Sequence, residues 1–400
     1  MKRVVIVGMS LAGLRAAESL RRSGCDATIT AIGAETQTPY DRPPLSKDFL
    51  TKHRSFGDLS LRREGYDNLA IEWRLGVVAA GLDLVRQEIA LDDGASVEFD
   101  ELIIATGTTP RHLPAAVCDP MLQGVHYLRT YDDAVALRSD IANARRVCVI
   151  GAGFIGAEIA ASCRALNVDV TMLEAQPQPM IRGLGETLGA VCAQLHRDHG
   201  VDVRVGVQIR SVAGTGRVER VVLDDGDEIL CDVVVVGIGV EPCTDWLRGS
   251  GLTLENGVVC DEYCVAAANV HAAGDVARWP NPLFDGELMR LEHWTNAAEQ
   301  GAHVGESIAS GEQKPFAPVP FVWSDQYDCK IQSVGRFNAD DEMSIVHGDL
   351  ESRKFVALFG RDGRLSGALG FSQPRHVMIA RRQISERVSY TDAVAAARAT

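Results

Sequence analysis

One pattern occurs twice in this chain and limits its possible folds more than any other feature. In each copy an apolar strand runs directly into a glycine-rich turn, and the turn runs into a helical stretch. The first copy, residues 2–24, reads KRVVIVGMSLAGLRAAESLRRSG, and the second, residues 147–174, reads VCVIGAGFIGAEIAASCRALNVDVTMLE. A strand, turn and helix in this order open a βαβ unit with parallel strands. The 400-residue chain is therefore expected to hold two doubly wound α/β domains, with length left for another.

The second copy carries a complete dinucleotide fingerprint. Gly151 permits the tight turn, Gly153 lets the backbone approach a pyrophosphate, and Gly156 lets the helix pack on the strand. The pyrophosphate would lie at the helix N-terminus, where free N–H groups and the helix dipole favour negative charge. Glu174 ends the next strand 23 residues after Gly151, where an acidic side chain can bind ribose hydroxyl groups. This copy predicts a dinucleotide site.

The first copy departs from the fingerprint at two places. Gly8 and Gly13 match it, but Ser10 stands at the place of the middle glycine. Serine adds only a small side chain, and its hydroxyl can donate to a phosphate, so we expect a working variant of the turn. Gly33 stands where the second copy has its acid, and Glu35 is the nearest candidate for the ribose. Two working turns predict two nucleotide cofactors.

Three other segments indicate how the two units are arranged along the chain. Segments 99–114 and 269–277 each contain a strand that is followed by a glycine, and segment 230–242 closes the second unit in the same manner. Open α/β sheets bind their ligands at the carboxyl ends of such strands. The order of the segments predicts a first nucleotide domain that is interrupted by a second, after which the chain returns to complete the first.

Charge and hydropathy exclude two classes of partner. The formal net charge of −14 argues against nucleic acid, because phosphate backbones are bound by clustered Lys and Arg. The charge is uneven, with a balance of +2 over residues 313–400 and of −16 over residues 1–312. No segment approaches the ~20 apolar residues of a membrane span, so no membrane partner is expected.

The ten cysteines form no framework. Only Cys260 and Cys264 lie close together, and a single C-x3-C pair is poor spacing for a metal. We therefore expect no metal site, and we expect the protein to be cytoplasmic, where thiols stay reduced.

Five motifs together are more specific than any glycine turn. They are PYDRPPLSKDFL at residues 39–50, then GAGFIGAE, AAGDVA, RLEHWTNAAEQG and FVWSDQY. With these motifs the whole chain resembles the FAD-dependent pyridine-nucleotide reductases of the glutathione reductase fold. Among them it resembles the NADH–ferredoxin reductases that serve cytochrome P450s and aromatic-ring dioxygenases.

The resemblance implies an α/β fold with three domains. Two of them would be Rossmann-like, one binding FAD and one binding NAD(P), and the third a C-terminal α+β domain. The FAD-binding domain would be discontinuous, from 1–112 and 245–312. The NADH-binding domain would span 113–244 and the C-terminal domain 313–400.

The resemblance also implies which residues bind the cofactors. Asp275 would bind the ribitol of FAD, and Arg42 and Arg111 would lie by its pyrophosphate. The implied FAD-binding residues are Gly8, Ser10, Leu11, Ala12, Gly13, Glu35, Arg42, Lys47, Ala79, Thr106, Gly107, Arg111, Gly274, Asp275 and Trp294. The implied NADH-binding residues are Gly151, Gly153, Ile155, Gly156, Glu158, Glu174, Gly237, Ile238 and Gly239.

The implied catalytic residues are Lys47, Glu158 and Trp323. Lys47 would lie near flavin N5 and pair with Glu158, while Trp294 and Trp323 would lie at the flavin edge. A lysine beside the ring would favour hydride acceptance, because a flavin becomes negatively charged when it is reduced. The pattern alone also allows a plainer interpretation, in which Lys47 and Glu158 are two solvated charges on separate turns. Trp323 could likewise only seal the nicotinamide pocket.

The implied activity is hydride transfer from NADH to FAD, followed by transfer of single electrons to a [2Fe–2S] ferredoxin. Disulfide reductases of this fold carry a C-x4-C pair after the first nucleotide unit, whereas residues 39–50 contain no cysteine. Electrons would therefore leave the flavin without a thiol relay. The alternatives are a rubredoxin reductase, an NADH oxidase, or an NADH-binding interaction protein that resembles apoptosis-inducing factor.

The expected partner is an acidic ferredoxin that docks transiently. Its docking surface would combine Trp323 with Lys52 to Arg54 and with Arg381 and Arg382. The alternative for segment 376–384, which carries the last two arginines, is an ordinary solvated helix face. The protein itself is expected to be a monomer or a weak homodimer.

Overall fold

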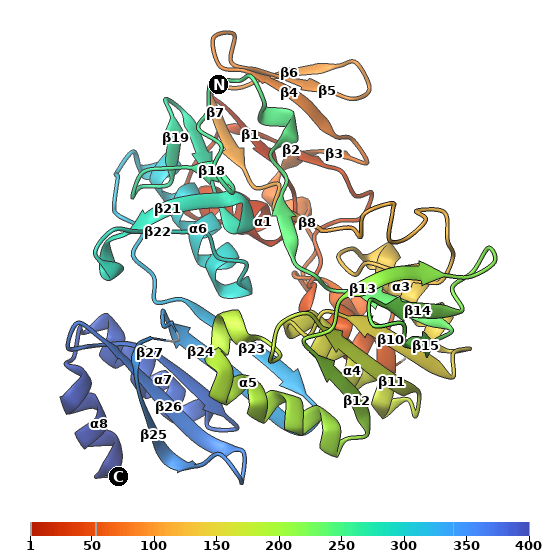
Figure 1. Ribbon diagram of the computed structural model, residues 1–400. Helices are drawn as coiled ribbons and strands as arrows, with labels where there is room; N and C mark the ends of the chain where they lie inside the picture. Colours follow the sequence, from red (N-terminus) through yellow and green to blue (C-terminus); the bar gives the residue numbers. More distant parts are fainter. Residues whose placement is uncertain (1, 53, 339, 400) are drawn as a thin grey trace. The chain divides into compact units, whose positions relative to one another are not determined.

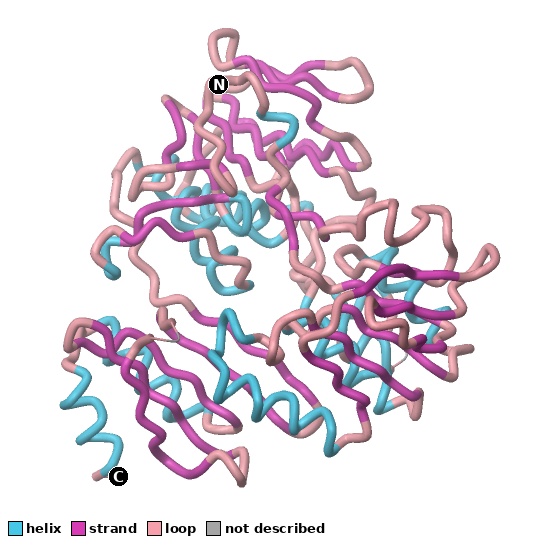
Figure 2. Tube along the Cα trace, viewed as in Figure 1, coloured by secondary structure: helices cyan, strands magenta, loops and turns pink. Residues whose placement is uncertain are grey.

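The computed structural model describes residues 2–52, 54–338 and 340–399, apart from the side chains of residues 182 and 183. Figures 1 and 2 show the order and kind of the elements. Residue contacts divide the chain into two compact units, each assembled from separate segments. The first unit comprises residues 1–41, 59–109 and 241–321, and the second comprises residues 42–58, 110–240 and 322–400. The boundaries of the FAD-binding, NADH-binding and C-terminal domains given above remain a prediction.

The first unit is built on a six-stranded sheet around the first strand–turn–helix copy. The buried, β-branched strand β1 pairs in parallel with β2 on one side and with β7 on the other. Strands β20 and β3 extend the parallel sheet, and β19 closes one edge in the antiparallel direction. The sheet order is β19 (Val265–Ala267), β20 (Val270–Ala272), β7 (Glu101–Ile104), β1 (Arg3–Val7), β2 (Thr28–Gly33), β3 (Ile71–Leu75).

One apolar core joins this sheet to two helices and a small meander. Helix α1 (Leu11–Arg22) packs closely against α6 (Trp294–Ser310), and both contribute to the core together with the strands of the sheet. Two three-stranded sheets flank it: β4 (Ala79–Asp83), β5 (Glu88–Leu91) and β6 (Ser96–Glu98), then β18 (Val258–Val259), β21 (Ala277–Asn281) and β22 (Glu287–Met289). The return of segment 241–321 to this core completes the first unit, as the segment order predicts.

The second unit repeats the parallel arrangement around the second copy. Strand β10 pairs in parallel with β11 and β16, and α4 (Phe154–Ala165) follows β10 directly. The sheet order is β12 (Val201–Val205), β11 (Asp169–Glu174), β10 (Arg146–Ile150), β16 (Val233–Val236), β9 (Val125–His126). Further elements are α3 (Tyr131–Ile141) and the meander β13 (Ile209–Ala213), β14 (Arg220–Leu223), β15 (Glu228–Leu230). The two parallel sheets confirm the doubly wound α/β prediction.

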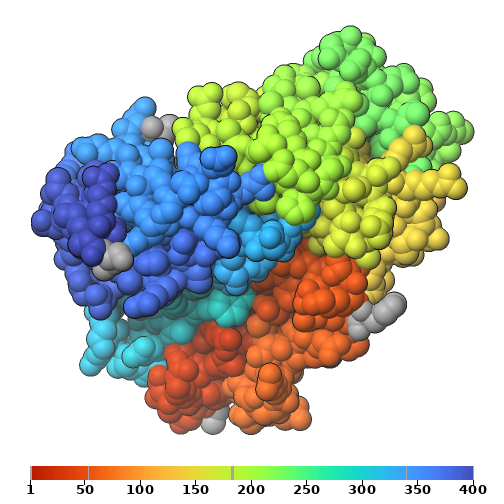
Figure 3. All heavy atoms as spheres, turned by 90° about the horizontal axis from the view of Figure 1, so that it is seen from below, coloured from red at the N-terminus to blue at the C-terminus, as the bar shows by residue number. Residues whose placement is uncertain are grey.

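A five-stranded antiparallel sheet near the C-terminus carries helices on both faces. On β26, Phe355, Ala357 and Phe359 share a core with α5 (Ile181–Asp198), whereas the alternate residues Val356 and Leu358 face the groove between α7 and α8. Figure 3 shows α5 in yellow-green against the blue spheres of this sheet. The order is β23 (Phe321–Gln326), β24 (Cys329–Gly335), β27 (Arg364–Phe371), β26 (Lys354–Arg361), β25 (Glu342–Asp349), with α7 (Pro374–Ser385) and α8 (Tyr390–Arg398).

The remaining elements are short. They are α2 (Asp48–Thr51), the paired strands β8 (Thr108–Pro110) and β17 (Val240–Pro242), and the 3-10 turns η1 (Pro43–Ser46), η2 (Phe56–Leu59), η3 (Asp67–Leu69), η4 (Asp245–Leu247), η5 (Gly274–Val276), η6 (Pro282–Phe284). Across the part of the chain that the structure describes, no helix combines the length and the apolar character that crossing a membrane requires.

Candidate functional site

The first glycine turn can be made only by glycine. Gly8 has φ +100°, and a Cβ at this position would lie 2.2 Å from the carbonyl oxygen of Ala105 on the neighbouring strand connection. The turn ends at Ser10, the N-cap of α1, so the first N–H groups of the helix point toward whatever lies above the turn. Leu11, Ala12 and Gly13 form the buried first turn of this helix.

A cavity of about 230 Å³ lies at the carboxyl ends of these strands. Five residues that the sequence assigns to FAD line it: Gly8, Ser10, Glu35, Ala79 and Thr106. Its other walls include Tyr40, Leu75, Cys243 and Trp246, which the sequence analysis did not single out. The cavity therefore lies where the parallel-sheet rule places a ligand, at the end of β1 and β2.

The carboxylate of Glu35 comes from the loop that follows β2. Glu35 lines the cavity two residues beyond Gly33, and its carboxylate accepts a hydrogen bond from the Tyr40 hydroxyl. This bond holds an acidic group at the place where a ribose hydroxyl would need it. The position supports Glu35 as the ribose residue, which remains a prediction.

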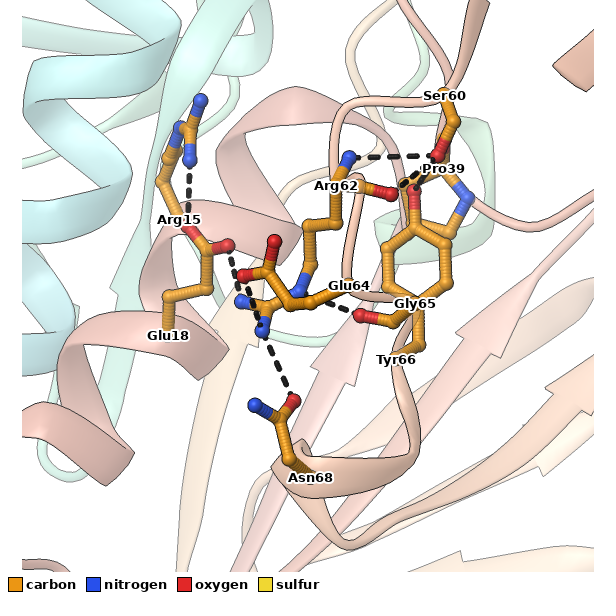
Figure 4. A network of polar contacts seen from close by, with 9 residues as sticks. All are labelled: Arg15, Glu18, Pro39, Ser60, Arg62, Glu64, Gly65, Tyr66 and Asn68. Carbon is orange, nitrogen blue, oxygen red and sulfur yellow. Dashed lines mark hydrogen bonds and ion pairs between the residues drawn. The ribbon is translucent and has the colours of Figure 1, made fainter.

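A polar network fixes the loop that forms one wall of the cavity (Figure 4). The Arg62 guanidinium donates to Glu18 on α1 at 2.6 Å, and to the Gly65 carbonyl at 2.7 Å. The Tyr66 hydroxyl then donates to the carbonyl of Pro39, a lining residue, at 2.5 Å. The Arg62 side chain is only 9% exposed, so water does not readily compete for its hydrogen bonds. The network therefore links the cavity wall to α1.

Further residues assigned to FAD lie on segment 241–321. The Gly274 N–H donates to the buried Gln300 amide at 2.9 Å, and the Thr108 hydroxyl lies 3.3 Å from the Asp275 carboxylate. The Trp294 indole donates to Asp41 at 2.7 Å. Two more of the residues assigned to FAD, Thr106 and Gly107, lie after β7 and not on this segment. The Thr106 hydroxyl donates a hydrogen bond to the Cys243 carbonyl at 2.9 Å, and Gly107 has φ +68°.

These features fit FAD. The turn at Gly8 leaves no room for a side chain, and it is followed by the N-terminus of α1. Glu35 lies beyond the second strand, and a cavity lies at the strand ends. Together these features fit an adenine dinucleotide. Arg42 and Arg111 belong to the second unit, where they donate to the carbonyls of Arg129 and Val240. Their contact with the pyrophosphate remains a prediction.

The second turn leaves open space at its middle glycine. Gly151 has φ +96°, and a Cβ there would lie 2.3 Å from the Gly237 carbonyl, so this glycine is required by the fold. A Cβ at Gly153 would meet no described atom within 4 Å. The protein's own packing therefore does not require glycine at 153, whereas a pyrophosphate lying against the turn would.

The acid of the second copy is held against its own turn. Glu174 accepts from the backbone N–H of Ala152 at 2.9 Å through one carboxylate oxygen, and from that of Gln176 at 2.9 Å through the other. Ile155 and Ile238, beside the turn, are 42% and 38% exposed. Exposed apolar side chains at this place are suited to contact a bound ligand. Gly239 lies in the connection between β16 and β17. The arrangement supports a dinucleotide site with the ribose at Glu174.

The structure brings Lys47 and Glu158 together. The Lys47 ammonium lies 2.8 Å from one oxygen of Glu158, whose side chain is only 6% exposed. The Ser46 hydroxyl donates to the other oxygen at 2.6 Å, and the Ser324 hydroxyl donates to the first at 2.7 Å. The plainer interpretation, two solvated charges on separate turns, is wrong, because three donors enclose a buried carboxylate. Participation of this pair in catalysis remains a prediction.

Sequence reasoning missed the two serines. Ser46 precedes Lys47 in the PPLSKDF motif, and Ser324 follows Trp323 in FVWSDQY, so each lies beside a residue that was assigned a role. A buried hydroxyl needs a partner, but the sequence does not show which strand will bring one. Trp323 itself lies on β23 and is half-buried.

The described residues contain no group of three or more His, Cys, Asp or Glu side chains that could hold a metal ion. Cys260 and Cys264 are buried thiols, and burial raises the pKa of Cys264 to about 12. Thiols of this kind are poor nucleophiles and poor metal ligands near neutral pH.

Substitution of Ser10 tests whether the first turn approaches a pyrophosphate. Ser10→Gly is expected to leave the FAD content of the purified protein nearly unchanged, because it removes only a small side chain. Ser10→Leu is expected to lower it, because a large side chain would fill the space above the turn. Absorbance of bound flavin per chain measures both. Full FAD content in Ser10→Leu would show that no phosphate lies there.

Glu174 is expected to set the preference for NADH over NADPH. Its carboxylate would repel a 2′-phosphate, and Ala175 and Gln176 supply no compensating base. One such contact corresponds to about 5- to 150-fold in kcat/KM, from roughly 1–3 kcal/mol. Glu174→Gln should reduce the preference, whereas the same change at Glu186 should not. Equal kcat/KM of the native protein for both nucleotides would contradict the assignment.

The chain is similar to known reductases along almost its whole length. The profile of the pyridine nucleotide-disulphide oxidoreductase family matches residues 2–301, and that of the reductase C-terminal domain matches residues 321–400. Rhodocoxin reductase of Rhodococcus erythropolis is 38% identical over 98% of this chain and 92% of its own length. The ferredoxin–NAD(+) reductase component of the anthranilate 1,2-dioxygenase system of Burkholderia cepacia is 38% identical over 95% of this chain and 93% of its own.

A solved structure agrees over the whole chain. The covalent putidaredoxin reductase–putidaredoxin complex has a chain with a TM-score of 0.93 and 30% identity, covering 100% of this chain and 99% of that one. These matches confirm the fold class and the resemblance that the motifs indicate.

Proposed function

The chain belongs to the pyridine nucleotide-disulphide oxidoreductase family, and from this premise we propose that it is an NADH-dependent ferredoxin reductase of an oxygenase system. The observation that carries the proposal is the near full-length similarity to reductases named for that activity, including the rhodocoxin and anthranilate dioxygenase components. The oxygenase served would be a cytochrome P450 or a ring-hydroxylating dioxygenase.

The two nucleotide sites supply the two halves of this reaction. The first turn and its cavity hold FAD, and the second turn with Glu174 holds NADH. When bound, FAD accepts an electron pair as a hydride and releases electrons one at a time, which a [2Fe–2S] acceptor requires. The chain contributes a charged ammonium at Lys47, which the buried carboxylate of Glu158 holds in place.

The segment that would carry a redox disulfide carries this ion pair instead. Residues 39–50 contain no cysteine, and Lys47 lies between η1 and α2 in that segment. A thiol relay therefore has no residue to form it there. Electrons would therefore pass from a bound flavin to the partner protein without a thiol relay from this segment.

The partner is an acidic [2Fe–2S] ferredoxin that binds transiently. Of the basic residues expected at its docking surface, Lys52 and Arg54 form ion pairs with Asp48 at 3.0 and 2.7 Å. The Asp48 carboxylate lowers the net positive charge of this part of the surface. His53 lies outside the described residues. Arg382 is exposed on α7, where it lies 3.7 Å from the Glu386 carboxylate and beside the exposed side chains of Met378 and Ile379. Mixed apolar and basic surface of this kind suits a protein partner better than solvent alone. The protein would act in the cytoplasm as a monomer or a weak homodimer.

Replacement of Trp323 separates the two steps. Trp323→Ala is expected to impair electron transfer to ferredoxin and to leave reduction of FAD by NADH largely intact, because the indole belongs to the docking surface. Single-turnover rates of each step measure this. Damage confined to the NADH step would make Trp323 a wall of the nicotinamide pocket.

Ionic strength provides a second test of docking. Ferredoxin reduction should slow as salt rises, since exposed charges are screened over ~10 Å at 0.1 M salt. Arg382→Glu should weaken this dependence, whereas Arg398→Glu, at an exposed position on α8, serves as the control. A rate that is independent of salt would contradict docking by charge.

A further inference from the structure

A row of buried polar side chains leads away from the Lys47–Glu158 ion pair within the second unit. Ser324 donates to Glu158 at 2.7 Å, and the Gln326 amide nitrogen lies 3.1 Å from the Ser324 oxygen. The Gln326 oxygen lies 3.1 Å from His196 Nε2, and His196 Nδ1 lies 2.9 Å from the Tyr327 hydroxyl. We call Ser324, Gln326, His196 and Tyr327 the polar row. It joins β23 and the residue that follows it to α5 and α4.

The chemistry of its members gives the polar row a single direction. An ionised carboxylate only accepts, so the Ser324 hydroxyl must donate to Glu158 and can accept only from the Gln326 N–H. The Gln326 oxygen is then free to accept, so the proton of His196 is on Nε2. Its Nδ1 is the acceptor for the Tyr327 hydroxyl. Every donor in the row therefore points toward Glu158.

Three residues of the polar row are buried, so the loss of one hydrogen bond among them cannot be compensated by water. Ser324, Gln326 and His196 are each 0% exposed, so none of them can exchange a lost partner for water. Burial also lowers the pKa of His196 to about 4, which keeps the imidazole neutral. The titratable groups that face it are Tyr327 and, stacked on the Tyr327 ring at 3.7 Å, His199.

We propose that Gln326 and His196 are positioning residues that act through Ser324 on the Lys47–Glu158 pair. The proposal rests on the role of Lys47 in the proposed function. Without the Gln326 N–H, the Ser324 hydroxyl loses the contact that orients it and can turn away from Glu158. The carboxylate then keeps two of its three donors, and the ammonium that it holds is less well fixed.

The first experiment replaces Gln326 by Met, which keeps the volume and removes both polar groups. The rate of FAD reduction by NADH should fall about 10-fold, with the KM for NADH within about 2-fold, because an interaction made in the transition state is weakened. The matched control is Gln332→Met. Gln332 is a buried glutamine on β24 whose Oε1 has no partner in the described structure, so its loss should leave the rate unchanged.

A double-mutant cycle with Lys47→Met shows whether the effect passes through the ion pair. If it does, Gln326→Met should have no further effect on the rate in the Lys47→Met background. Effects that multiply would overturn the proposal. Ser324→Ala enters the same cycle with the same expectation, and it replaces Gln326→Met if that variant does not fold.

A measurement that does not depend on turnover completes the test. Nitrogen-15 spectra of labelled histidine should show His196 in the Nε2–H tautomer at pH 7, and Gln326→Met should shift it toward Nδ1–H, while Gln332→Met should not. If Lys47→Met is slow, while Gln326→Met keeps the native rate and the native His196 tautomer, this proposal is overturned and the role of Lys47 is not. A Lys47→Met enzyme of native rate would overturn the role of Lys47 and this proposal with it.

Discussion

Lys47→Met is expected to slow the reduction of bound FAD by NADH by about 10²-fold, with FAD content nearly unchanged. In the proposed function the ammonium would act on negative charge that develops during hydride transfer, so its loss would weaken binding of the transition state more than binding of the ground state. Anaerobic stopped-flow spectroscopy of the flavin measures the rate. A native rate would remove Lys47 from the mechanism.

Two variants control for indirect effects. Lys52→Met removes an exposed lysine five residues away and should leave this rate unchanged, because the reduction of FAD by NADH does not involve ferredoxin. Lys47→Met also leaves the buried Glu158 carboxylate without its cation, and breaking a buried pair costs about 3–5 kcal/mol. The double variant Lys47→Met/Glu158→Gln should recover part of this stability and stay slow. Recovery of the rate would assign the defect to misfolding.

The second large effect concerns stability in acid. His196 is buried, and burial lowers its pKa from 6.5 to about 4 in the folded protein. The unfolded chain therefore binds the proton more strongly, and the free energy of unfolding falls as the pH falls from 6.5 to 4. A difference of that size corresponds to about 3 kcal/mol, fully present as stability above pH 6.5.

His196→Gln should remove this dependence. Glutamine can donate to Gln326 and accept from Tyr327, but it does not titrate. The native protein should lose about 3 kcal/mol more than the variant between pH 6.5 and 4, as measured by denaturant unfolding. Because other groups titrate alike in both proteins, the difference isolates His196. Parallel pH profiles would show that His196 is solvated or already charged.

The two nucleotide units were predictable because their physical requirements are local. A tight turn at Gly8 or Gly151, a buried strand before it and a helix after it all lie within one continuous segment. Glu174 could be assigned from spacing because β10 and β11 pair in parallel register, which brings its carboxylate back to the turn. The return of residues 241–321 to the first unit was predictable from the strand ends that recur late in the sequence.

The surroundings of Glu158 could not be predicted in the same way. Ser46, Ser324, Gln326 and His196 lie 112, 166, 168 and 38 positions from it. Ser46 reaches Glu158 because η1 packs against α4, and the other three residues meet because β23 and α5 pack together in the second unit. No periodicity encodes such a meeting. Glu35 is an intermediate case. Its position two residues after Gly33 can be read from the sequence, but the hydrogen bond from Tyr40 that holds its carboxylate depends on the conformation of the loop.

In the proposed function, this protein takes a hydride from NADH and passes electrons singly from FAD to a ferredoxin. The most direct test is an anaerobic titration in which one equivalent of NADH is added to the protein with excess oxidised [2Fe–2S] ferredoxin, using putidaredoxin as the probe and further ferredoxins beside it. The proposed function requires two equivalents of reduced ferredoxin for each NADH, since each cluster accepts one electron. Oxidation of NADH only when oxygen is admitted, with no ferredoxin reduced, would contradict it and indicate an oxidase.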